Sequence, residues 1–183
     1  MSLGRDRVIG VVIPQNSMGR GFTQYSYLDG DLPDEYSLYS AFLDYVLDDG
    51  TRIHVNQADY YCGACRHIVV GERIESVTEL EHQIDQIQNH PESDDRKIAE
   101  FVGDIPKQIA ELQTRITWRK TRQSAPKCLY CGSINLAPIP DEEEFGHPTT
   151  GQRMKVSGRG FTDAAPWHAT YTSEGDLIKS GAT

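Results

Sequence analysis

All four cysteines of this chain fall into two pairs, and each pair has two residues between its members. The first pair lies in "YYCGACRH" and the second in "PKCLYCGSIN". Two thiolates at this spacing can converge on one cation when the chain turns tightly between them, and two such turns supply the tetrahedral sulfur shell that zinc accepts. We therefore predict one four-cysteine metal site, formed by Cys62, Cys65, Cys128 and Cys131.

The chemistry of four thiolates limits what such a site does. A closed shell has no open position for water, so it predicts a structural metal rather than a hydrolytic one. We expect Zn²⁺, with Fe as the alternative because the ligand set is the same. A thioredoxin-type redox pair needs a CxxC at the head of a helix after a strand, and neither pair has that context. We interpret His67 as a neighbour of the site and His147, in "GHPTTG", as a turn residue.

With their flanks, "DYYCGACRH" and "APKCLYCGS", the two turns resemble the zinc-ribbon, or rubredoxin-like, families. The resemblance implies a β-rich core clamped by a metal, and it covers the two turns only. It departs from the family pattern at Arg66, where glycine is common, and in the interval 66–127, which is far longer than a compact ribbon needs. Gly132 follows the second pair, where a left-handed backbone would turn amides toward the sulfurs. We expect Lys127 to offset part of the negative charge of the site, together with Lys120 or Arg122.

The interval between the pairs has the pattern of helices. Apolar residues recur at three-and-four spacing from Val77 to Ile87, and Ser76 with Glu79 forms a capping box. After "NHPESDD" the apolar spacing resumes, interrupted by a glycine and a proline, so we predict a short helix, a break and a longer helix from about Pro106 to Arg122. Two helices with narrow apolar stripes indicate an antiparallel hairpin.

This organisation predicts an α+β fold. Residues 1–75 and 123–183 would form a β-rich, zinc-ribbon-like core, and residues 76–122 an inserted helical hairpin whose foot the metal clamps. In the core we expect strands at 8–14, 51–55, 67–76, 153–161 and 167–178, a helix within 34–50, and a proline-broken acidic connector after the second pair.

A short sequence, "GRGFT", occurs twice, at 19–23 and 158–162. Each copy is followed by an aromatic residue and an acidic turn, "YLDGDL" after the first and "YTSEGDL" after the second. One hypothesis is a duplicated β-hairpin in which Arg20 and Arg159 line an anion site. The alternative is coincidence or a purely structural duplication, which the unequal spacing within the copies favours.

A basic cluster stands out in an otherwise acidic chain. The net charge of -9 argues against nucleic-acid binding by the whole surface, yet residues 112–140 contain no acidic residue. A nucleic-acid contact there would combine stacking on an indole ring with cations. The alternative is a solvated helix C-terminus, where cations complement the helix dipole. The residues concerned are Arg115, Trp118, Arg119, Lys120 and Arg122.

These observations favour a non-enzymatic structural zinc protein whose helical hairpin contacts a protein partner or a second copy of the chain. The alternatives are a nucleic-acid-associated zinc-ribbon protein and an iron-loaded redox carrier. The sequence has no phosphate-binding loop, dinucleotide fingerprint or nucleophile elbow. It also has no apolar run of membrane-spanning length and no apolar signal core, so we expect a cytoplasmic protein without membrane contact.

Overall fold

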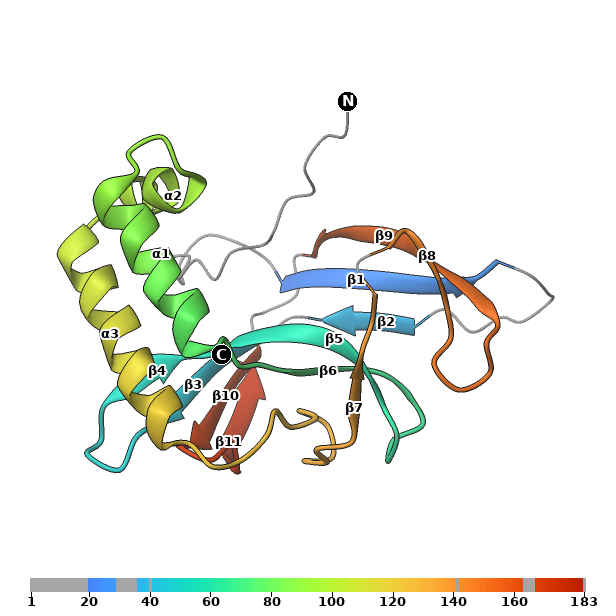
Figure 1. Ribbon diagram of the computed structural model, residues 1–183. Coiled ribbons are helices and arrows are strands. Elements are labelled where there is room, and N and C mark those ends of the chain that lie inside the picture. The colour runs from blue at the N-terminus through green and yellow to red at the C-terminus, as the bar shows by residue number, and fades with distance from the viewer. Residues whose placement is uncertain (1–19, 29–35, 40, 141, 163–166, 183) are drawn as a thin grey trace. The chain divides into compact units, whose positions relative to one another are not determined.

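The computed structural model describes residues 20–28, 36–39, 41–140, 142–162 and 167–182. These residues contain three helices and eleven strands, so the protein has an α+β fold (Figure 1). The chain divides into two compact units. The described part of one unit is Glu75–Arg122, and the other is formed by residues 18–74 and 123–183. The strand predicted at 8–14 lies outside the described residues.

The helical unit contains α1 (Val77–Asn89), α2 (Asp94–Val102) and α3 (Ile105–Thr121). The predicted capping box of α1 is confirmed: Ser76 Oγ accepts from the Glu79 amide at 3.1 Å, and Glu79 Oε2 accepts from the Ser76 amide at 2.7 Å. The helices pack around one apolar core. Each helix turns its apolar stripe toward this core, because apolar side chains are more stable there than in water. Its buried members are Leu80, Ile87, Ala99, Leu112 and Ile116.

Three sheets make up the β-rich unit. Sheet A has the order β2-β1-β9-β8, sheet B the order β11-β10-β3-β4, and sheet C the order β6-β5-β7. All neighbouring strands are antiparallel except β3 and β10, which are parallel. The strands are β1 Arg20–Tyr27, β2 Tyr36–Tyr39, β3 Phe42–Val46, β4 Arg52–His54, β5 Asn56–Cys62, β6 His67–Arg73, β7 Leu136–Pro138, β8 Glu144–Gly146, β9 Arg153–Thr162, β10 Trp167–Thr172 and β11 Leu177–Ala182.

The helix predicted within 34–50 is wrong, because its described residues form β2 and β3. Leu43 and Tyr45 are buried at 1% and 0% exposure, and Asp44 between them is not, which is the period-two pattern of a strand. Tyr45 also stacks on Tyr171 of β10, with ring centroids 5.1 Å apart. Pairing with this remote strand overrides the helical spacing of the local sequence. The acidic connector likewise contains two short strands, β7 and β8.

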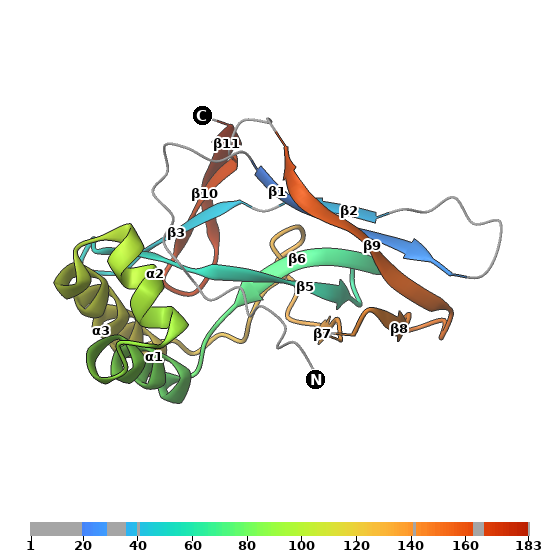
Figure 2. The same ribbon diagram turned by 90° about the horizontal axis from the view of Figure 1, so that it is seen from above.

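The two "GRGFT" copies pair with each other. Strands β1 and β9 run side by side and antiparallel, as Figure 2 shows. The register is symmetric over 20–23 and 159–162: the arginine of each copy faces the threonine of the other, and the glycine after each arginine faces the phenylalanine of the other copy. Arg20 and Arg159 are therefore not opposite each other in the backbone register, since each faces a threonine. The pairs are Arg20 with Thr162, Gly21 with Phe161, Phe22 with Gly160, and Thr23 with Arg159.

The duplication extends to the hairpins β3–β4 and β10–β11. Their turns, 47–51 and 172–176, make the same two backbone hydrogen bonds, and each has a glycine with positive φ, Gly50 at 83° and Gly175 at 81°. The second turn therefore matches "LDDGT", whereas residues 29–32 of "YLDGDL" lie outside the described residues. The turns also touch, because Ser173 Oγ donates to Asp48 Oδ1 at 3.1 Å. These contacts favour a structural duplication.

Candidate metal centre

Sheet C brings the two cysteine turns together. Cys62 ends β5 and pairs with His67 at the start of β6, so the first turn is the loop of a β-hairpin. Segment 127–129 lies alongside β6, and Cys128 forms an antiparallel bridge with Gly71. The second cysteine turn is thus held against β6, the strand that begins just after the first cysteine turn. Two backbone bonds fix this register: Glu72 N–H to Lys127 O at 3.0 Å and Leu129 N–H to Val70 O at 3.1 Å.

The chain after the second turn returns to the first one. β7 pairs with the end of β5, which places Leu136 opposite Cys62. The amide of Gly63 donates to Asn135 O at 2.9 Å. A Cβ at Gly63 would lie 2.2 Å from Asn135 Nδ2, so the absence of a side chain allows this close approach. Both sides of the first turn are therefore in contact with the segment that carries the second.

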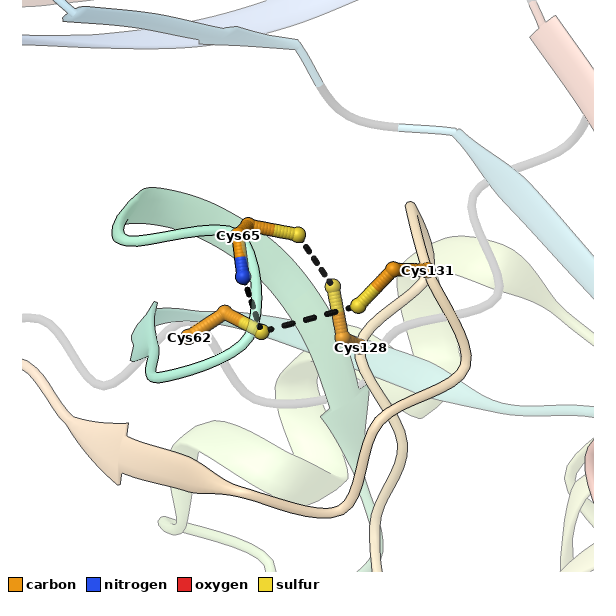
Figure 3. Close-up of side chains that lie close together, drawn as sticks. All are labelled: Cys62, Cys65, Cys128 and Cys131. Carbon is orange, nitrogen blue, oxygen red and sulfur yellow. Dashed lines mark hydrogen bonds between the residues drawn. The ribbon is translucent and has the colours of Figure 1, made fainter.

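The four sulfurs have the spacing of a tetrahedral thiolate shell. All lie within 4.8 Å of one another. The Cys62 and Cys131 sulfurs are 3.6 Å apart, and those of Cys65 and Cys128 are 3.9 Å apart (Figure 3). Tetrahedral zinc with Zn–S bonds of about 2.3 Å requires sulfurs about 3.8 Å apart. The cluster therefore fits one metal ion of this size, and it consists of these four cysteines alone among the described residues.

In each turn a backbone amide donates to the sulfur of the first cysteine. The Cys65 amide donates to Cys62 Sγ at 3.5 Å, and the Tyr130 amide donates to Cys128 Sγ at 3.4 Å. Such bonds stabilise thiolate charge and orient the ligands. Arg66, which departs from the family pattern, has the left-handed backbone that glycine commonly provides, with φ of 62°.

Burial divides the cysteines into an inner and an outer pair. Cys62 and Cys128 are 0% and 1% exposed, whereas Cys65 is half-buried and Cys131 is exposed. Burial raises the pKa of the Cys128 thiol to about 11 and also raises the pKa of Cys65. The Ser133 amide is the main cause that lowers the pKa of Cys131 to about 7. A bound metal replaces the protons that the Cys65 and Cys128 thiols would otherwise keep.

Of the residues predicted to neighbour the site, Lys127 and His67 have partners of their own. Lys127 Nζ donates to Asp176 Oδ1 at 2.6 Å, so its charge is paired. Lys120 and Arg122 belong to the helical unit. His67 Nδ1 lies 2.9 Å from the carbonyl of Cys65, and its ring contacts that of Tyr130 at 6.1 Å between centroids, so it is a neighbour of the site and not a ligand.

His147 is a turn residue, as its sequence context indicates. It is 5% exposed, and its ring lies against that of Tyr61, with centroids 5.0 Å apart. Its Nδ1 accepts from the amides of Thr149 and Thr150 at 3.3 and 3.4 Å. These bonds hold the loop between β8 and β9, and burial lowers the pKa of the imidazole.

The basic cluster of α3 does not form one exposed surface. Arg115 is buried and donates to Glu75 Oε2 at 2.6 Å. Trp118 and Arg122 are each 5% exposed, and the guanidinium of Arg122 lies 5.2 Å from the indole centroid. Of the five residues proposed to contact nucleic acid, Lys120 alone is exposed. Nucleic-acid contact stays a prediction, which this burial does not favour.

Sequence reasoning missed Glu72 of β6. It is 0% exposed, and one carboxyl oxygen accepts from the amide of Lys127 at 2.7 Å, next to Cys128. The hydroxyl of Tyr45 donates to the other oxygen. Strand alternation places Glu72 on the face of Ile68, which is also buried. A carboxyl group on the buried face of a predicted strand was the available signal.

The fold and the site together define an α+β protein with a four-cysteine cluster suited to a metal ion. In comparisons with known proteins, no protein-family model, curated protein or solved structure matches the chain. Over the described part of the chain, none of the helices has the length and apolar character needed to cross a membrane. The geometry of the site therefore carries the functional argument.

Proposed function

We propose that this protein is a non-enzymatic, structural zinc protein. The observation that carries the proposal is the convergence of four sulfurs, within 4.8 Å of one another, from two turns far apart in sequence. Thiolates fill all four positions of a tetrahedral ion, so Zn²⁺ here has no site for substrate or water. Its role is to tie the β5–β6 turn to the segment around Cys128, and binding energy at such a site is folding energy.

Metal analysis of the purified protein tests this proposal. We expect about one zinc ion per chain by elemental mass spectrometry, because one site closed by four thiolates binds one ion. Iron at the same stoichiometry, with visible absorption and reversible reduction, would instead support an iron-loaded carrier. Chain that binds neither Zn²⁺ nor Co²⁺ under reducing conditions would overturn the metal proposal. Chelation is expected to lower the melting temperature, whereas a Cys62→Ser variant is expected to show no further loss on chelation.

We further propose that the helical unit contacts a protein partner, through the turn between α2 and α3. Phe101 on α2 is 85% exposed, while Ala99 on the same helix is 1% exposed in the helical core. Gln108 Nε2 donates to the carbonyls of Ala99 at 3.0 Å and Gly103 at 2.6 Å, so the turn is braced. An aromatic side chain on a braced turn binds at low cost in conformational entropy and is a typical interface anchor.

The charge around Phe101 indicates the chemistry of the partner. The surrounding segment is acidic, so an apolar pocket rimmed by cations is complementary to it. A second copy of the chain is the alternative occupant. Within 92–104 the acidic residues are Glu92, Asp94, Asp95, Glu100 and Asp104, and the basic ones are Arg96 and Lys97.

Two measurements separate these occupants. Sedimentation equilibrium of wild type and Phe101→Ser detects self-association, which the variant is expected to abolish if the partner is a second copy. A photo-crosslinking amino acid at position 101 captures a different protein in cells, with position 107 as the exposed control. The captured protein is expected to bind Phe101→Ala more weakly than wild type and to lose affinity with added salt. Equal binding to wild type and Phe101→Ala would contradict the proposed surface.

A further inference from the structure

We call segment 123–127 the strap, because it leads into the second cysteine turn. The carboxyl group of Glu72 is fully buried and lies at the point where the strap meets this turn. Its Oε2 accepts from the Lys127 amide at 2.7 Å, and its own amide donates to Lys127 O at 3.0 Å. Glu72 thus contacts both the amide and the carbonyl of the residue that precedes Cys128.

Glu72 is in turn held from another sheet. The hydroxyl of Tyr45 in sheet B donates to its Oε1, and Tyr45 is 0% exposed and stacked on Tyr171. The hydroxyl of Tyr60 donates to the carbonyl of Glu72 at 3.1 Å. A buried polar group whose hydrogen bonds are all formed favours one conformation of the segments it joins. Breaking any of these bonds would leave a buried donor or acceptor unsatisfied.

A second carboxylate holds the strap further from the metal centre. Glu174, in the β10–β11 turn, accepts from the amides of Gln123 at 3.2 Å and Ser124 at 2.8 Å. The corresponding turn residue of the duplicated hairpin, Asp49, accepts instead from Thr51 in its own turn at 2.8 Å. The carboxylate of one turn therefore holds the strap, whereas the carboxylate of the other accepts within its own turn.

We propose that Glu72 is a positioning residue for the metal centre, an inference that rests on the proposed function. By fixing Lys127 against β6, it presets Cys128 at the distance from Cys62 and Cys65 that a metal requires. The four thiolates bind the ion, and Glu72 lowers the cost of bringing the second turn to it. Its removal therefore weakens metal binding and leaves the ligand set unchanged.

Competition titrations with Co²⁺ and Zn²⁺, against a chelator of known affinity, test this inference. We expect Glu72→Ala to bind both metals about 10- to 100-fold more weakly, the range for groups that orient metal ligands. The visible spectrum of its Co²⁺ complex is expected to keep the bands of four-thiolate coordination. Glu72→Gln is expected to stay closer to wild type, since its amide oxygen accepts from the Lys127 amide.

Two further carboxylate variants grade the effect. Glu174→Ala is expected to lose less affinity than Glu72→Ala, because the strap contacts of Glu174 lie three and four residues before Lys127. Glu144→Ala is the matched control: Glu144 is exposed and paired with Arg153, and its loss is expected to leave metal affinity unchanged. If Glu72→Ala does not fold, Tyr45→Phe takes its place, with an expected loss of about two- to tenfold, the value of one hydrogen bond.

The outcomes distinguish the two proposals. Wild-type protein that binds neither Co²⁺ nor Zn²⁺ overturns the proposed function itself. Wild-type protein that binds them, with a Glu72→Ala variant of equal affinity, overturns only the positioning role. A Glu72→Ala complex whose Co²⁺ spectrum has lost thiolate bands also contradicts it, because the ligand set has then changed.

Discussion

Arg66 and Gly132 occupy matching places in the two cysteine turns. Each follows the second cysteine of its pair, and φ is positive in both, 62° at Arg66 and 73° at Gly132. The amide of each donates to the carbonyl of the first cysteine, at 2.7 Å to Cys62 and 2.9 Å to Cys128. The two turns therefore share the left-handed conformation and the hydrogen bond at this position, although the residue is an arginine in one and a glycine in the other.

This equivalence predicts opposite effects of two substitutions. Gly132→Ala is expected to lower the free energy of unfolding by about 1–2 kcal/mol, because a Cβ is disfavoured in the left-handed region. No atom lies within 4 Å of the added Cβ, so the cost is conformational. Arg66→Gly is expected to raise stability by up to about 1 kcal/mol for the same reason.

Urea unfolding of the metal-loaded proteins measures both changes. Gly181→Ala is the control, since Gly181 has no positive φ and open space around its Cα. Its effect is expected to stay within about 0.5 kcal/mol. A Gly132→Ala variant as stable as wild type would show that the second turn has another backbone.

The buried ion pair of the helical unit predicts a structural role for Arg115. Its side chain and that of Glu75 are 3% and 5% exposed, and the two are joined at 2.6 Å. Arg115→Met leaves Glu75 buried without this partner, at an expected cost of about 3–5 kcal/mol in thermal or urea unfolding. The double variant Arg115→Met/Glu75→Met is expected to regain most of that loss. Lys120→Ala, at an exposed position, is expected to change stability by less than about 0.5 kcal/mol.

Two single variants, Lys120→Ala and Arg119→Ala, decide whether α3 contacts nucleic acid. We expect no binding of labelled single-stranded oligonucleotides even at low salt, where electrostatic binding is strongest. Binding that Lys120→Ala and Arg119→Ala both weaken, without loss of stability, would instead support the nucleic-acid alternative.

His147 predicts a loss of stability on mild acidification. Its pKa in the folded protein lies below the ordinary value of 6.5 because burial disfavours the charged ring. A lowered pKa contributes stability that is present above 6.5 and lost as the pH falls through the folded value. Protonated Nδ1 would also face the amides of Thr149 and Thr150, which are donors.

Melting temperatures measured between pH 7.5 and 5 test this prediction on the metal-loaded protein. His147→Asn is expected to reduce the pH dependence, since its side-chain oxygen accepts from the amide two residues on and does not titrate. His82→Gln, at an exposed helix position, is expected to keep it. Equal pH profiles for wild type and His147→Asn would assign the acid loss to other groups.

The capping box at the start of α1 predicts a smaller effect. Ser76→Ala removes the hydroxyl that accepts from the Glu79 amide, at an expected cost of about 1 kcal/mol. Thr78→Ala, two residues on and exposed, is the control and is expected to be neutral or slightly stabilising, because alanine is the better helix former. Helix content by circular dichroism and urea unfolding report both results.

Features set by residues close in sequence could be predicted. The capping box depends on two residues three apart, and the strands β6 and β9 follow from their local pattern. The proximity of the four cysteines was also predictable, because the CxxC spacing has few chemical uses. The strand β3 was not predictable, because its apolar spacing also suits a helix and the competing interaction is with β10, from the other end of the chain.

By itself, then, the sequence determined the four-cysteine cluster and most of the helical unit, since turn spacing and helix periodicity depend on neighbouring residues. The tertiary structure alone decided the register of segment 127–129 on β6, the left-handed backbone of Arg66 and the burial of Glu72 and Arg115. It also decided the pairing of the two "GRGFT" copies. These features depend on contacts between residues far apart in the chain, whose free energy becomes available only when the distant strands have met.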